Sequence, residues 1–202
     1  MEEIMKWNLI LTCLISFLLF TSISCQSDKK RDPESQSKGT EVKTLPSGEI
    51  TYTAPEDWVK QQPSSSMRKD QFSLPGVEGA EDAELAVFFF QNSGGTVEAN
   101  LNRWYGQFKQ PDGSPTESHV ESKKLSVHVI PITIAYVTGT YMKSGSSMMG
   151  GPVDELPEYA LMAAIAETAN GPWFFKATGP QKTIDHWRPS FEKFAQSYHV
   201  KK

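Results

Sequence analysis

The distribution of apolar and polar residues divides the chain into three parts. Residues 7–20 are apolar at all but a few positions and lead into a cysteine. Residues 26–48 contain almost no large apolar side chains. From residue 49 to residue 199, short apolar runs alternate with turn residues, which is typical of a folded domain. The pattern therefore predicts one domain preceded by two segments that lie outside it.

The domain begins with strands. Alternating or continuous apolar runs predict strands at residues 49–55, 57–61, 67–75 and 83–90. In the second of these, Trp58 is expected to point inward. The fourth is apolar on both faces near its end, so we expect it in the interior of a sheet.

A helix is expected next, because apolar residues recur at a spacing of three and four. They are Val97, Leu101, Trp104 and Phe108. Thr96 has the hydroxyl side chain that caps helix N-termini. Since Trp104 belongs to the apolar face, its neighbour Tyr105 is expected to point outward.

The second half of the domain returns to strands. Runs at residues 118–125, 126–130, 132–142, 159–168 and 172–179 have strand character, and residues 143–157 read as a long loop rich in Gly, Pro and Ser. Asn170-Gly171 between two such runs predicts a hairpin with a type I′ turn. Residues 160–166 also have the composition of a helix, and the hairpin partner favours a strand.

A closing helix is predicted from one apolar face, which includes a proline. The residues of that face are Ile184, Trp187, Phe191, Phe194 and Tyr198. Pro189 lies inside the pattern and lacks a backbone N–H, so we expect a break or kink just before Trp187.

Strands, a helix, more strands and a final helix, joined by short connections, indicate an antiparallel β-sheet covered by helices, an α+β fold. The segments YTAPEDWVKQ, SSSMRKDQFSLP, GPWFFKATGP and WRPSFEKFAQS resemble a group of uncharacterised secreted bacterial proteins and, more loosely, PsbP-like domains. The resemblance spans roughly residues 49–198. It implies PsbP-like α/β/α layers and an accessory or binding role, and it carries no active site.

The charge of the chain limits its partners. The 202 residues carry a net charge of −4. A nucleic-acid-binding domain needs a basic surface to offset phosphate charge, so nucleic acid is not an expected partner. The same negative balance argues against electrostatic attachment to anionic lipid.

The first 25 residues resemble a bacterial lipoprotein signal. Lys6 precedes the apolar run, and Ser22, Ile23 and Ser24 lead into Cys25. The resemblance implies that Cys25 receives a diacylglycerol on its thiol and that cleavage occurs before it. The lipobox of this family prefers Leu where this chain has Ser22. An uncleaved signal anchor and an ordinary secretory signal with an incidental cysteine are the alternatives.

This interpretation divides the chain into three regions and predicts where the protein is located. Residues 1–24 are a lipoprotein signal peptide, residues 25–48 a lipidated cysteine followed by a disordered tether, and residues 49–199 a single α+β domain. We expect an exported protein held at a membrane by the lipid on Cys25. Gln26 gives no inner-membrane retention signal, which favours the outer membrane.

The sequence predicts no catalytic residue, metal ligand or cofactor. Ser66 and Lys69 match an S-x-x-K motif, but on a strand residues three apart face opposite sides. The four histidines lack the spacing of metal ligands.

The favoured function is therefore a non-catalytic binding or accessory role. The loop at residues 143–157 is long for a strand connection, and its Met148 and Met149 are candidate contacts for a protein or a small apolar ligand. A loop without a role is the alternative interpretation of this segment. The alternative for the whole protein is an envelope hydrolase that uses carboxylates near Glu78, Glu81 and Asp82.

Overall fold

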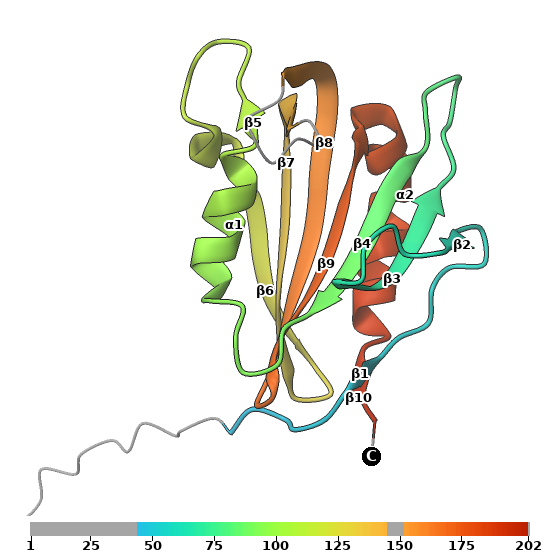
Figure 1. Ribbon diagram of the computed structural model, residues 1–202, viewed down its shortest axis with the longest axis vertical. Coiled ribbons are helices and arrows are strands. Elements are labelled where there is room, and N and C mark those ends of the chain that lie inside the picture. Colours follow the sequence, from blue (N-terminus) through green and yellow to red (C-terminus); the bar gives the residue numbers. More distant parts are fainter. Residues whose placement is uncertain (1–43, 145–151, 202) are drawn as a thin grey trace, which may run out of the picture. The chain divides into compact units, whose positions relative to one another are not determined.

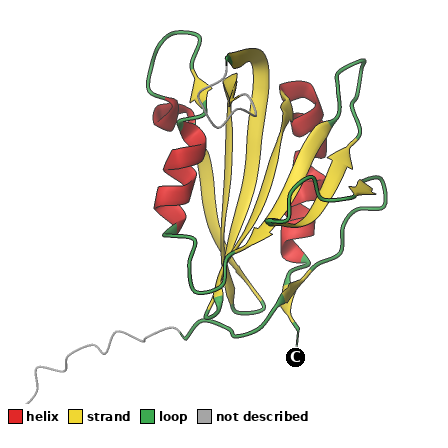
Figure 2. Ribbon diagram, in the orientation of Figure 1, coloured by secondary structure: helices red, strands yellow, loops and turns green. Residues whose placement is uncertain are grey.

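The computed structural model describes residues 44–144 and 152–201, and it is an α+β structure in which a helix lies on each face of an antiparallel sheet (Figures 1 and 2). The elements, in chain order, are β1 (Ile50–Thr51), β2 (Val59–Gln61), β3 (Arg68–Leu74), β4 (Ala83–Phe89), α1 (Val97–Tyr105), β5 (Phe108–Lys109), the short 3₁₀ helix η1 (Thr116–His119), β6 (Glu121–Val127), β7 (Ile130–Ser144), β8 (Val153–Thr168), β9 (Gly171–Pro180), α2 (Gln181–Gln196) and β10 (His199–Val200).

The main sheet has the order β2-β3-β4-β9-β8-β7-β5, and β6 pairs with the other end of β7. Every pair of neighbouring strands is antiparallel, which confirms the predicted fold class. The predicted interior position of β4 is also confirmed. The expectation of short connections is wrong at one place, because the chain passes through α1 from β4 to β5, across three intervening strands. β1 and β10 form a separate two-stranded ribbon.

Both faces of the central strands are buried, which explains their continuous apolar sequences. In β8, Met162 and Ala164 pack on the side of α2, whereas Leu161, Ala163 and Ile165 pack on the side of α1. The run that also suited a helix is therefore a strand whose small side chains accommodate a layer on each face. The predicted α/β/α layering follows from this alternation.

The core on the α2 side is aromatic. The ring centroids of Trp58 and Phe194 lie 5.1 Å apart, and Tyr198 stacks on Phe175 at 4.3 Å. Trp58 is buried, as predicted. Tyr198 lies beyond the end of α2 and still belongs to this cluster.

α2 is continuous from Gln181 to Gln196, so the predicted break before Trp187 is wrong. Pro189 is exposed, and so is Asp185, whose carbonyl would accept the hydrogen bond that proline cannot donate. Because this carbonyl lies on the solvent side of the helix, water can replace the missing donor.

α1 begins as predicted, with the Thr96 hydroxyl accepting a hydrogen bond from the Ala99 amide at 3.1 Å. The helix ends at Tyr105, and Phe108 continues the same apolar cluster from β5. The prediction that Tyr105 points outward is wrong, because its side chain is only 5% exposed. The buried stripe of α1 is wide enough to include the two adjacent residues Trp104 and Tyr105.

Several predicted boundaries need correction. The strands expected at residues 49–55 and 57–61 shrink to β1 and β2. The two strands expected between residues 118 and 130 are η1, the single strand β6, and a turn at His128-Val129, where both residues have positive φ. The predicted loop at residues 143–157 is shorter, because β7 and β8 continue their pairing to Ser144 and Val153.

The hairpin at Asn170-Gly171 is confirmed, but its predicted type I′ turn is wrong. Thr168 pairs with Gly171, which leaves Ala169 and Asn170 as the turn residues, and neither has a positive φ. Gly171 itself has a φ of +126°, and a Cβ there would lie 2.4 Å from the carbonyl oxygen of Phe90. The glycine is needed for close approach of the β4–α1 loop.

Candidate functional site

The helix α1 covers only part of its sheet face. Its buried residues pack on β7, β8 and β9 through Ala135, Val137, Leu161, Ala163, Ile165 and Phe174. Among residues 44–144 and 152–201, this face carries two clefts that the helix leaves open. The α1–β6 cleft, of about 690 Å³, lies between α1 and the β6–β7 hairpin. The lysine cleft, of about 510 Å³, lies over β3, β4 and β9 beside the far ends of β7 and β8. The two clefts share no lining residue.

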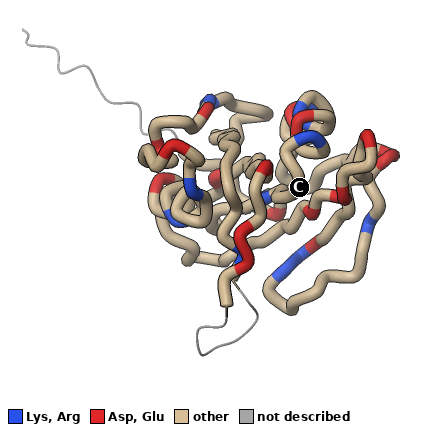
Figure 3. The backbone as a smooth tube through the Cα atoms, turned by 90° about the horizontal axis from the view of Figure 1, so that it is seen from above, with Lys and Arg blue, Asp and Glu red and all other residues tan. Residues whose placement is uncertain are grey.

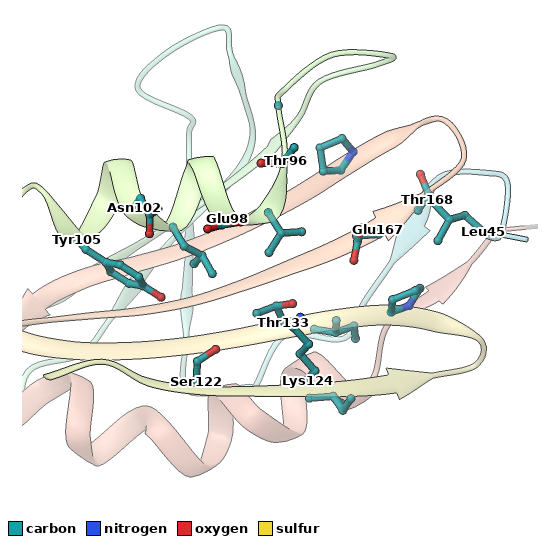
Figure 4. Close-up of a pocket in the computed structure, with 17 residues that line it drawn as sticks. Leu45, Thr96, Glu98, Asn102, Tyr105, Ser122, Lys124, Thr133, Glu167 and Thr168 are labelled. Carbon is teal, nitrogen blue, oxygen red and sulfur yellow. The ribbon is translucent and has the colours of Figure 1, made fainter. Parts of the chain in front are cut away.

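Polar side chains of the helix and of the strands face one another across the α1–β6 cleft. Figure 4 shows Glu98, Asn102 and Tyr105 on the helix side, and Ser122 and Lys124 on the strand side. Apolar residues complete the lining, and they include Leu45, Val97, Leu101, Pro131 and Pro172. The cleft therefore combines an apolar body with several hydrogen-bonding groups, which is typical of small-molecule sites.

Strand register places the polar groups in this cleft. Ser122 pairs with Ala135 and Lys124 pairs with Thr133, and directly paired residues share a face. Ala135 packs on the α1 side, so Ser122, Lys124 and Thr133 lie on that side as well. The next residue along β6, Leu125, packs against the core cluster of the opposite face and also borders the cleft at the sheet edge. The sheet is thus polar where the helix does not cover it.

Tyr105 supplies a hydrogen-bond donor inside the cleft. Its ring is buried and its hydroxyl points into the cleft (Figure 4). No other residue in the described part of the chain forms a side-chain hydrogen bond with this hydroxyl. Burial raises the pKa of Tyr105 to about 12, so the group stays protonated at neutral pH.

The start of the described chain borders the same cleft. Leu45 lines it, and the carbonyl of Pro46 accepts a hydrogen bond from the Ala169 amide at 2.9 Å. The Gly48 amide donates to Oδ1 of Asn170 at 2.8 Å. Residues 44–48 are predicted to be part of the tether, but they lie along the β8–β9 turn. The described chain starts beside the β8–β9 turn (Figure 1), and Leu45 in this first stretch lines the α1–β6 cleft.

The carboxylates named for a hydrolase do not all meet. Glu81 and Asp82 line the lysine cleft, whereas Glu78 lies outside it, 3.8 Å from Lys182. Asp82 accepts hydrogen bonds from the Ser73 hydroxyl at 2.6 Å and from a backbone amide.

These hydrogen bonds lower the pKa of Asp82, with the Ser73 hydroxyl as the main cause. A general acid needs the opposite shift. Asp82 therefore acts in holding the β3–β4 connection.

The other predicted site residues lie outside the described residues. Cys25, Met148 and Met149 belong to this group, so lipidation and the binding role of the methionines stay predictions. Over residues 44–144 and 152–201, no helix is long and apolar enough to cross a membrane. Within those same ranges, His, Cys, Asp and Glu side chains form no group of three that could hold a metal ion.

Acidic and basic residues are interspersed over the domain (Figure 3). Several form exposed ion pairs, such as the pair of Arg188 and Glu121, which joins α2 to β6. The sequence pattern gave no signal for either cleft, because each depends on strand register and on how far α1 extends over the sheet.

Comparison with known proteins adds structural neighbours of low similarity. No protein-family model matches the chain, and no curated protein matches it in sequence. PA94, a Pseudomonas aeruginosa protein of unknown function described as a candidate regulator, is 12% identical with a TM-score of 0.46, over 77% of this chain and 99% of its own. CyanoP, the PsbP of Synechocystis sp. PCC 6803, is 12% identical with a TM-score of 0.45, over 81% and 96%. LpqN, involved in cell envelope biogenesis of Mycobacterium tuberculosis, is 9% identical with a TM-score of 0.42, over 76% and 83%.

Proposed function

We propose that this protein is an exported, lipid-anchored accessory protein of the cell envelope whose PsbP-like domain binds a small amphipathic ligand in the α1–β6 cleft. The observation that carries the binding role is the cleft itself. Its volume of about 690 Å³ lies within the usual range of ligand sites. Its apolar walls suit a hydrocarbon or ring system, and Tyr105 and Asn102 suit the polar substituents of the same ligand.

The place of the cleft supports a ligand drawn from the membrane. About 20 residues separate Cys25 from Leu45, and a flexible segment of that length has a root-mean-square reach of roughly 25 Å. Lipid on Cys25 would therefore keep the edge of the cleft near the bilayer, because Leu45 lines it. An amphipathic molecule that leaves this bilayer would be close to the cleft.

Anchoring is tested by replacing Cys25. The Cys25→Ser variant loses the thiol that the lipid needs, so it should move from the detergent phase to the aqueous phase on phase separation of whole-cell extracts. Mass spectrometry of the purified parent protein should find the acylated cysteine at the new N-terminus. An unchanged detergent partition would mean that another segment holds the protein at the membrane.

Ligand binding is tested with the neutral fluorescent dye N-phenylnaphthylamine and two matched variants. Ser122 and Ser126 are both exposed on the same face of β6, and of the two only Ser122 lines the cleft. Ser122→Trp should fill the cleft and weaken dye binding about tenfold or more, a loss of at least about 1.4 kcal/mol. Ser126→Trp should bind the dye as the parent does. Equal binding by both variants would place the dye elsewhere and remove the support for this cleft.

A further inference from the structure

Lys176 lies in the lysine cleft without an acidic partner. It is a residue of β9, between β4 and β8, and its Nζ donates a hydrogen bond to Oε1 of Gln107 at 2.6 Å. None of the ion pairs among the described residues includes Lys176. An ammonium group has three donors, so one neutral amide leaves most of its capacity unused.

Aromatic rings surround this ammonium. Nζ of Lys176 lies 5.8 Å from the ring centroid of Trp104 and 5.9 Å from that of Tyr141. The rings stabilise the cation through their faces, but they do not neutralise its charge. Tyr141 stacks on Tyr159 with centroids 6.1 Å apart and ring planes 10° apart, which gives the cleft a flat apolar wall next to the charge.

Two of the neighbouring charged groups pair with each other, and a third is held by hydrogen bonds. Arg68 contacts the Glu84 carboxylate at 2.8 Å, and the other oxygen of Glu84 accepts a hydrogen bond from Gln71 at 2.9 Å. Asp82 is held by the Ser73 hydroxyl. The lysine cleft thus contains an uncompensated cation close to carboxylates that would repel a second negative charge.

We propose that the lysine cleft is a second ligand site, which binds a monocarboxylate through Lys176 and places the apolar group of that ligand against Tyr141 and Tyr159. Lys143 also lines the cleft, but it is exposed to solvent, so a single carboxylate matches the one partly buried lysine of the lining. It leaves no excess negative charge beside Glu84 and Glu81. A phosphate monoester would bring a second charge toward the same acids. The site is separate from the α1–β6 cleft and does not depend on the function proposed for it.

The test uses benzoate as the probe and its neutral isostere benzamide as the control. Both are titrated into the full-length protein, and amide chemical shifts are followed by NMR at residues 174–178 and at Tyr141. Benzoate should produce saturable shifts there, and benzamide should bind about tenfold more weakly or not at all, because a hydrogen bond to a charged group contributes about 1.5–3 kcal/mol. Equal binding of the two compounds, or no saturable shift with benzoate, would overturn the proposal.

Variants identify the group responsible. Lys176→Gln should lower benzoate affinity about tenfold or more, whereas Lys124→Gln, which changes a lysine of the other cleft, should leave it unchanged. Unaltered benzoate affinity in Lys176→Gln would contradict the proposal. Tighter binding of phenylphosphate than of benzoate would also contradict it, because it would assign the site to dianions. The comparison of benzoate with benzamide needs no variant, so a folding defect in Lys176→Gln cannot leave the question open.

Discussion

The backbone amide of Gly48 donates a hydrogen bond to Oδ1 of Asn170 at 2.8 Å, although the two residues are 122 positions apart in the sequence. The main-chain carbonyl of Asn170 also accepts a hydrogen bond from the Asn92 amide at 2.9 Å. Asn170 therefore joins the N-terminal segment, the β4–α1 loop and the β8–β9 turn. Its side chain acts as a clamp on the segment that carries Leu45 into the α1–β6 cleft.

Removing this clamp should loosen the N-terminal segment without unfolding the domain. In Asn170→Ala, the Gly48 amide loses its acceptor, so its hydrogen exchange should accelerate about fivefold, which corresponds to one hydrogen bond of roughly 1 kcal/mol. The free energy of global unfolding should fall by about 1 kcal/mol or less. Asn170→Asp keeps an acceptor oxygen and serves as the control. Unchanged exchange at Gly48 in the alanine variant would show that the backbone contacts alone hold the segment.

Pro189 should lower the stability of α2. Replacing it with alanine restores an N–H that can donate to the carbonyl of Asp185, and alanine is favoured by about 3 kcal/mol over proline inside helices. Because the existing helix already accommodates the proline at an exposed position, we expect a smaller gain, of about 1 kcal/mol, in the free energy of unfolding. Urea denaturation measures it. Lys193→Ala, another exposed position of the helix, should change stability by only a few tenths. A destabilised Pro189→Ala would mean that the proline supports a bend that packing requires.

The sequence was informative wherever packing follows directly from residue type. The spacing of apolar residues predicted β3, β4, β9 and both helices, because each of these elements buries one or two defined faces. The aromatic face of α2 was predicted residue by residue for the same reason. Trp187, for example, is buried, and its indole N–H donates to the carbonyl of Pro75.

The sequence was uninformative wherever tertiary register decides. Ser122 and Thr133 are ordinary strand residues, and their shared place in a cleft depends on the pairing of β6 with β7. Tyr105 was assigned to the surface because helix periodicity predicts the direction of a narrow stripe and not its width. Lys176 lies in a run that is typical of a strand, and it lacks an ion-pair partner because Glu84 of β4 pairs with Arg68 of β3.

Gly179 allows close approach of two strands, and a side chain there should be costly. A Cβ on Gly179 would lie 2.4 Å from the Cβ of Ala83 and 2.6 Å from its Cα. Gly179→Ala should therefore separate β9 from the start of β4 and lower the free energy of unfolding by about 1–3 kcal/mol, the usual effect of overpacking. Gly106→Ala is the matched control, because Gly106 has a helical φ of −62° and a Cβ there meets its nearest atom at 3.5 Å. The shift of the denaturant midpoint from that of the parent protein should be at least twice as large for Gly179→Ala as for Gly106→Ala, or opposite in sign. Equal shifts would contradict the steric explanation.

Lys176 should also make stability depend on pH in a defined direction. Burial is the main cause that lowers the pKa of its ammonium from 10.5 to about 8. The charges of Arg103 and Arg68 lower this pKa further, whereas the charge of Glu84 raises it. Between pH 8 and pH 10, the folded protein loses this proton and the unfolded chain keeps it. The unfolded state then binds more protons, so the free energy of unfolding rises with pH in this range.

The lowered pKa of Lys176 limits this rise in the free energy of unfolding to about 3 kcal/mol. Lys176→Met removes the titrating group, so urea-unfolding midpoints of this variant should lack the rise between pH 8 and pH 10. Lys124→Met removes an exposed lysine, and this variant should still show the rise between pH 8 and pH 10. Above pH 10 the buried tyrosines act in the opposite direction: the pKa of Tyr105 is raised to about 12, so the unfolded chain loses that proton first and stability falls. A parent protein whose stability is flat or falling from pH 8 to pH 10 would mean that the ammonium of Lys176 is already compensated, in conflict with the cleft geometry.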